Sequence, residues 1–251
     1  MVMPFSTLQV TMLGTQFVLR LEYRTVNSPM KNSELIEMPD EILEYWSSLS
    51  RELASRFNAE EVTTSSEWWS WDNFGDDIRT LRNRFGIGDK YVEILGLRVD
   101  FETGETSDLF AEKKFHTSRI IPHLYYHSKA KDEGIAGEWV KFNSLSGSWA
   151  CRYAFDEQDI GRLTAAYTEH KEKLFDALER LGAKRVEFGD AGFEVSFLPM
   201  VKVLLVFEDA DEEFPASVRL LYDKNSIFYM PHEQLGDISW FLAGRVLTAI
   251  K

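Results

Sequence analysis

The chain has 251 residues, of which 44% are hydrophobic and 14% are aromatic. This composition excludes an intrinsically disordered protein and predicts a globular chain that is long enough to bury a core of its own. Its 41 acidic and 28 basic residues give a net charge of -13. Such a charge repels phosphate backbones and anionic membrane surfaces, so we expect neither nucleic acid nor a membrane as a partner.

Cys151 is the only cysteine of the chain. A single thiol excludes an internal disulfide framework, and it excludes zinc or iron–sulfur sites built from several cysteines of this chain. The first ten residues contain neither a basic segment nor a long apolar core, and no run of about 18 apolar residues occurs. We therefore expect a cytoplasmic protein.

Hydrophobic spacing predicts the first elements. Apolar residues alternate over 8–23, as is typical of a β-hairpin, and a polar link covers 26–38. Asp40 is then a candidate N-cap of a helix of about 17 residues, because apolar residues follow it at three- and four-residue spacing. Residues 61–89 indicate an aromatic-rich insertion with one short helix that stops at Gly86.

Strand patterns return at 91–106. The pattern over 108–131 is helical, but Pro122 lies inside it and predicts a kink or two separate pieces. Alternating apolar residues then predict short strands at 139–142 and 149–155.

A long helical pattern follows Asp156, and it predicts one helix, or two joined near His170, ended by Gly182. The apolar run 201–207 has the length and composition of a strand buried on both faces. With the alternating residues 217–222 it predicts a hairpin that the rest of the chain is built around, with its first strand at the centre of a sheet.

A last amphipathic helix is expected at 238–250. Together these elements predict an α+β fold, in which a mixed, mainly antiparallel sheet is packed by helices and carries an N-terminal β-hairpin extension. The simplest organisation is a hairpin extension over 1–38 and a single α+β domain over 39–251 that contains the insertion 61–89. If there is a further domain boundary, it falls near 131–137.

Short motifs in the second half of the chain follow one another in a characteristic order. They are GEWVKF at 137–142, YAF at 153–155, LG at 181–182, GD at 189–190, LP at 198–199, DEEFPAS at 211–217 and LLYD at 220–223. In this order and spacing the sequence resembles an uncharacterised prokaryotic family of domains of unknown function, DUF3786, over about residues 90–250.

The resemblance implies an accessory role. Members of that family occur mainly in anaerobic bacteria and archaea, and some are fused to a cysteine-rich iron–sulfur module of the sort found on corrinoid proteins of one-carbon metabolism. A corrinoid or a divalent metal is therefore the implied cofactor, and a corrinoid or iron–sulfur protein is the implied partner. The present chain lacks the four-cysteine module, which argues against electron transfer, and the family offers no catalytic residues to carry over.

Three of the five histidines, His116, His123 and His127, are candidate metal ligands. Helical spacings of seven and four place them on one stripe, and the i, i+4 pair allows two imidazoles to share one ion. Against this, Pro122 interrupts the helix that the geometry requires, and a neutral histidine half-buried among tyrosines is an ordinary structural residue. The structural role is the favoured interpretation.

Trp68, Trp69, Trp71 and Phe74 are candidate cofactor-binding residues. They form either an aromatic floor for a planar ligand, or a contact for a protein partner, or simply part of the core. The carboxylates of 208–213 suit a hard cation such as Ca²⁺ or Mg²⁺, but their spacing fits no calcium loop, so a solvated hairpin turn is favoured.

These observations leave several functions open. The leading hypothesis is a non-catalytic cytoplasmic accessory or binding protein associated with corrinoid or metal-cofactor metabolism, and it rests mainly on the family resemblance. The alternative is a metal-dependent hydrolase that uses the histidine-lined site with a carboxylate as the base. A purely structural partner-binding subunit is a third possibility.

Overall fold

The computed structural model describes residues 8–13, 16–21, 39–63, 66–111, 115–145 and 157–250. The chain separates into two compact units, Met1–Glu34 and Leu35–Lys251. In the first unit, β1 (Leu8–Leu13) pairs antiparallel with β2 (Gln16–Leu21), in agreement with the alternating pattern of the sequence. The proposed organisation into a 1–38 extension and one 39–251 domain stays a prediction.

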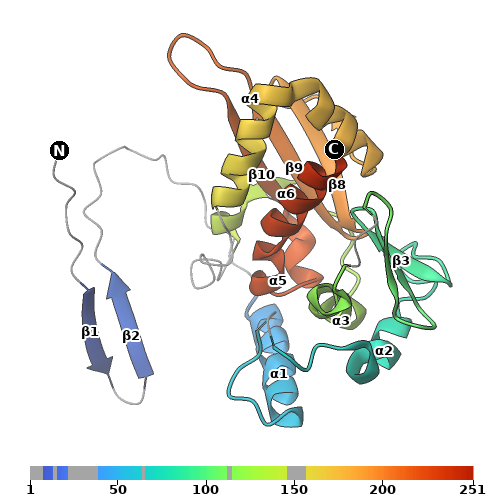
Figure 1. Ribbon diagram of the computed structural model, residues 1–251. Helices are drawn as coiled ribbons and strands as arrows, with labels where there is room; N and C mark the ends of the chain where they lie inside the picture. Colours follow the sequence, from blue (N-terminus) through green and yellow to red (C-terminus); the bar gives the residue numbers. More distant parts are fainter. Residues whose placement is uncertain are drawn as a thin grey trace. The chain divides into compact units, whose positions relative to one another are not determined.

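A five-stranded antiparallel sheet lies at the centre of the second unit (Figure 1), in the order β6-β10-β9-β8-β7. The strands are β6 (Trp139–Lys141), β7 (Lys184–Val186), β8 (Ala191–Leu198), β9 (Val201–Glu208) and β10 (Ser217–Asp223). Within 201–207 only Lys202 is not fully buried, so the prediction of a central strand there is confirmed.

A smaller antiparallel sheet joins β3 (Tyr91–Ile94), β4 (Leu97–Asp100) and β5 (Thr106–Asp108). The predicted α+β class is confirmed. However, the described strands of this unit form two sheets rather than one, and every strand pairing in them is antiparallel. The small sheet is fixed to the last helix by a buried ion pair, in which Arg245 donates to both oxygens of Asp108 at 2.7 Å.

Helices cover one face of the large sheet, where α4 and α6 lie in front of β8, β9 and β10 (Figure 1). The helices are α1 (Asp40–Arg56), α2 (Trp71–Arg79), α3 (Ile121–Lys129), α4 (Glu157–Arg180), α5 (His232–Gly236) and α6 (Ile238–Ala249). Their apolar sides and the odd-numbered residues of β9 share one core. No helix in the described part of the chain has the length and hydropathy needed to cross a membrane.

Helix ends differ from the sequence predictions in two places. The N-cap of α1 is Pro39 rather than Asp40, and no side chain caps the helix; Asp40 is its first residue, where a negative charge still favours the N-terminus. The helix predicted to stop at Gly86 ends at Arg79. Positive φ angles at Asn83, Phe85 and Gly86 show that the chain beyond it does not continue as a helix.

The helix predicted over 108–131 is wrong for the described part of its first half: β5 ends at Asp108, and Thr117–Arg119 form a 3-10 turn, η1. A regular helix, α3, starts only at Ile121, because the missing N–H of Pro122 is tolerated in a first turn. The expectation of two helices joined near His170 is confirmed: His170 has φ -142° and ψ 41° inside α4. The strand predicted at 149–155 and the Asp156 cap lie outside the described residues.

Candidate functional site

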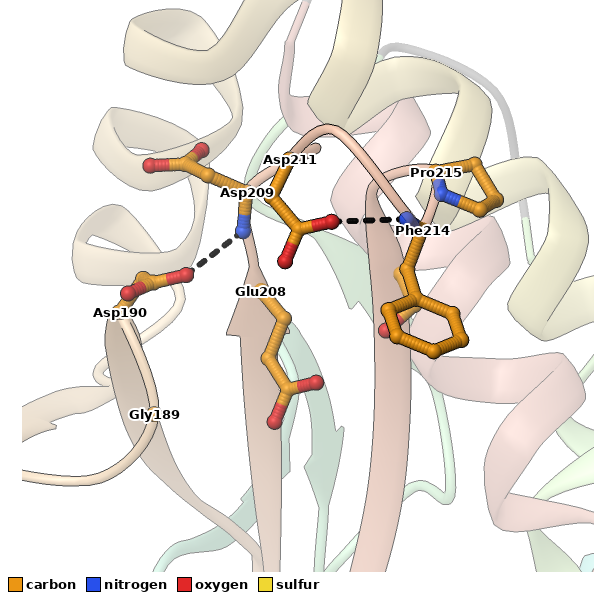
Figure 2. Close-up of a pocket in the computed structure, with 8 residues that line it drawn as sticks. Gly189, Asp190, Glu208, Asp209, Asp211, Phe214 and Pro215 are labelled. Carbon is orange, nitrogen blue, oxygen red and sulfur yellow. Dashed lines mark hydrogen bonds between the residues drawn. The ribbon is translucent and has the colours of Figure 1, made fainter.

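Two turns that are distant in sequence meet at one end of the large sheet and enclose a depression of about 450 Å³ (Figure 2). One turn leads into β8, and the other connects β9 to β10. We call this depression the acidic groove. It is lined by Gly189, Asp190, Glu208, Asp209, Asp211, Phe214, Pro215 and Ser217.

The turn before β8 lies directly against β9. A Cβ atom at Gly189, which has φ +60°, would come within 2.8 Å of Val206 Cγ1 and 3.0 Å of the Phe207 carbonyl oxygen. Glycine is therefore required for this close approach. The carboxylate of Asp190 then accepts a 2.7 Å hydrogen bond from the backbone N–H of Asp209, which joins the two turns (Figure 2).

Asp211 organises the connection between β9 and β10. One of its carboxylate oxygens accepts a hydrogen bond from the backbone N–H of Phe214 at 2.7 Å (Figure 2). The same oxygen accepts another from the backbone N–H of Glu213 at 2.8 Å. The bond from Phe214, followed by that from Glu213, lowers the pKa of Asp211. This local closure places the Phe214 side chain at the surface, where it is 66% exposed.

The other carboxylates of the groove also have partners in the protein. Lys171 donates to both oxygens of Asp209, at 2.7 and 2.8 Å, and the Tyr167 hydroxyl donates to one of them at 2.6 Å. Lys171, followed by Tyr167, lowers the pKa of Asp209. Arg219 pairs with Glu208. These contacts favour the interpretation of 208–213 as a structured, solvated hairpin turn, and they hold a negatively charged surface in place.

A larger and shallower depression, of about 950 Å³, adjoins the acidic groove on the side of α4. The two share Gly189 and Asp190, and the second is also lined by Phe188, whose side chain is 41% exposed. An exposed phenylalanine therefore lines each of the two depressions. An aromatic side chain left in water beside a concave surface is characteristic of a binding surface.

The three candidate metal ligands lie in different surroundings. His116 is exposed and precedes η1, whereas His123 and His127 are buried on α3. The ring of His123 lies 5.0 Å from that of Phe241, and the ring of His127 lies 4.9 Å from that of Phe85. Within the ranges of the chain that the structure describes, no group of three His, Cys, Asp or Glu side chains could hold a metal ion. Metal binding by these histidines stays a prediction.

Burial sets the charge state of the two inner histidines. Loss of hydration lowers the pKa of His123 to about 4. The same effect, with the positive charge of Arg84 as the second cause, lowers the pKa of His127 to about 3. Both imidazoles are therefore neutral at physiological pH.

Two of the four candidate aromatic residues belong to the core. Trp69 is 1% exposed and Phe74 is fully buried, and the indole N–H of Trp69 donates to the Thr63 carbonyl at 2.7 Å. Trp68 and Trp71 are half-buried, and Trp71 has no ring contact with the other three. The structure thus groups Trp68, Trp69 and Phe74 but does not form one exposed floor from all four. Their role in cofactor binding stays a prediction.

Sequence reasoning missed the role of Asp190 and the exposure of Phe188. The signal for Asp190 was the GD motif at 189–190, which was noted only as part of the resemblance. A second motif residue, Asp223, proves to be structural. Its buried carboxylate accepts from the backbone N–H groups of Ala136, at 3.1 Å, and Gly137, at 2.7 Å.

Comparisons with known proteins agree with the resemblance. No curated protein and no solved structure matches this chain. The family model described as a domain of unknown function, DUF3786, matches residues 92–245. This match covers more than half of the chain, so the protein belongs to the DUF3786 family.

Proposed function

We propose that this protein is a cytoplasmic, non-catalytic accessory or binding protein, and that a protein partner occupies its acidic groove. The observation that carries the proposal is Phe214. Its side chain is 66% exposed, more than any other large apolar side chain in the described part of the chain, and Asp211 holds the turn that presents it. Aromatic side chains in such positions are frequent anchors of protein interfaces.

Charge indicates the chemistry of the partner. The groove presents four carboxylates, of which Glu208 is paired with Arg219 and Asp209 with Lys171. Asp190 and Asp211 supply the remaining negative charge there, and the whole chain carries a net charge of -13. A partner surface that combines lysine or arginine with apolar side chains would complement it, and the opposite charges would speed their association. The family resemblance suggests a corrinoid or iron–sulfur protein of one-carbon metabolism as that partner.

Isothermal titration of the full chain with a purified corrinoid protein tests this proposal. We expect binding that weakens as salt is raised, because the contact is partly electrostatic. Phe214→Ser should weaken it by at least about tenfold, as for an interface hot spot. Ile135→Ser is the matched control, because Ile135 is also exposed, at 41%, but does not line the groove. Equal affinities of both variants and the unmodified protein would exclude the groove, and no binding at all would exclude a corrinoid protein.

A further inference from the structure

Several buried side-chain polar atoms of α3, β10 and α5 make no hydrogen bond. Within the described residues, both ring nitrogens of His123, the hydroxyl of Tyr222 and both amide atoms of Gln234 have no partner. The exposed fractions of these residues are 0%, 0% and 1%. Buried polar atoms of native proteins nearly always have a partner, and an ordered water molecule often supplies it. Three such side chains in one region therefore need an explanation.

His123 and Tyr222 both lie near Asp237, which separates α5 from α6. His123 Nε2 is 3.9 Å from Asp237 Oδ2, which is beyond hydrogen-bond distance. Burial, and then the charge of Asp237, raises the pKa of Tyr222, so the carboxylate is near the phenol. Gln234 precedes Asp237 by three positions. The backbone carbonyls of Arg119 and Gln234 lie beside the imidazole of His123, but neither has hydrogen-bond geometry to a ring nitrogen.

The cluster reaches the protein surface at Asp237. Its side chain is 28% exposed, whereas that of His123 is 1% exposed. A partly exposed carboxylate thus lies 3.9 Å from a fully buried imidazole. Around that imidazole the walls are apolar: the rings of Phe197 and Phe241 lie 5.4 and 5.0 Å from it.

We propose that one or more ordered water molecules bind in this cluster and bridge His123, Tyr222 and Gln234 to Asp237. A neutral imidazole has one donor and one acceptor, a phenol has both functions, and a glutamine amide has two donors and an acceptor. Water, which donates and accepts, can satisfy this mixture. A cation would leave the donors unpaired, and an anion would leave the acceptors unpaired. The site therefore selects a small neutral molecule with both functions.

A crystal structure of the full chain, together with that of Tyr222→Phe, tests the proposal directly. We expect ordered density within about 3.2 Å of His123 Nε2 or the Tyr222 hydroxyl, and its loss or displacement in Tyr222→Phe. Absence of this density from the unmodified protein, or an anomalous signal from a metal at the same place, would overturn the proposal.

Thermal unfolding gives a second readout. Tyr229→Phe is the matched variant, because the Tyr229 hydroxyl has a protein partner: it donates to Asp132 at 2.8 Å. If water pairs with Tyr222, both variants should lower the Tm by a similar amount, about 2–4 °C. An unchanged or higher Tm for Tyr222→Phe alone would mean that its hydroxyl is unpaired, and would contradict the proposal. Should Tyr222→Phe not fold, Gln234→Met replaces it in both experiments.

Discussion

Acid should destabilise this protein at pH values where most carboxylates are still ionised, because His123 and His127 are buried as neutral imidazoles. Burial lowers the pKa of His123 to about 4, and burial with the charge of Arg84 lowers that of His127 to about 3, from 6.5. As pH falls through 6.5, the unfolded chain therefore binds protons that the folded chain does not, and stability is lost. From pH 7 to pH 5 the loss is about 2 kcal/mol for each histidine, or about 4 kcal/mol for both.

Urea unfolding at pH 5, 6 and 7, followed by tryptophan fluorescence, measures this loss. His127→Leu removes one of the two linked protonations, so its free energy of unfolding should fall by about 2 kcal/mol less over the same interval. His116→Gln is the control, since it removes an exposed imidazole instead of a buried one. Carboxyl groups with a lowered pKa, such as Asp108 and Asp211, titrate below this interval. The same pH dependence in His127→Leu and the unmodified protein would refute the reasoning.

Three further predictions concern the buried ion pair between Arg245 and Asp108, the close contact of Gly104 with Trp71, and the metal content of the protein. Burial, the largest single effect, would raise the pKa of Asp108, but the hydrogen bonds and charge of Arg245 together with the backbone N–H groups of Phe110 and Ala111 outweigh it, so the pKa is lowered. Asp108→Asn leaves Arg245 buried without its ionic partner and should therefore cost about 3–5 kcal/mol of unfolding free energy in urea. Gly104→Ala should cost about 2 kcal/mol or more by the same assay, because φ is +72° and the new Cβ atom would overlap the ring of Trp71. Elemental analysis of protein prepared without a His tag should find less than stoichiometric zinc, iron or manganese. Stoichiometric metal that disappears in His123→Ala would instead support the hydrolase.

Matched substitutions show whether the two stability effects are specific. Arg98→Met removes an exposed ion pair with Glu93, and it should change the unfolding free energy by about 1 kcal/mol or less. Gly88→Ala introduces a Cβ atom into open space and should be nearly neutral. If Arg98→Met or Gly88→Ala lowered the unfolding free energy as much as Asp108→Asn or Gly104→Ala, both explanations would be contradicted.

Local signals predicted the elements of this fold well where they were strong. The apolar run 201–207 identified the central strand, because only a strand buried on both faces tolerates such a continuous run. The pattern after Asp156 allowed one helix or two joined near His170, and the structure has the break. The helix end at Gly182 followed from its tolerance of positive φ, observed at +84°.

The candidate site could not be predicted in the same way, because it depends on strand register. Pairing of Ala191 with Phe207 brings the turn at 189–190 beside the connection 208–215. No local pattern encodes that pairing. The sequence showed the carboxylates of the connection but not Asp190 beside them, and it did not show whether Phe214 would be buried or exposed.

Whether the other candidate residues lie in the core or at the surface depends on long-range packing, which local sequence patterns do not encode. Trp69 and Phe74 enter the core because Tyr125 of α3 packs beside both, with ring centroids 5.9 and 4.9 Å away. The three histidines do not share one helical face, because α3 begins only at Ile121 and His116 therefore lies outside the helix.

Hydrogen–deuterium exchange with and without a purified corrinoid protein tests the central claim most directly, because it reports which surface a partner covers. We expect slower exchange in peptides that cover 187–190 and 208–215. Slower exchange confined to the aromatic segment around Trp68, with the acidic groove unchanged, would contradict it.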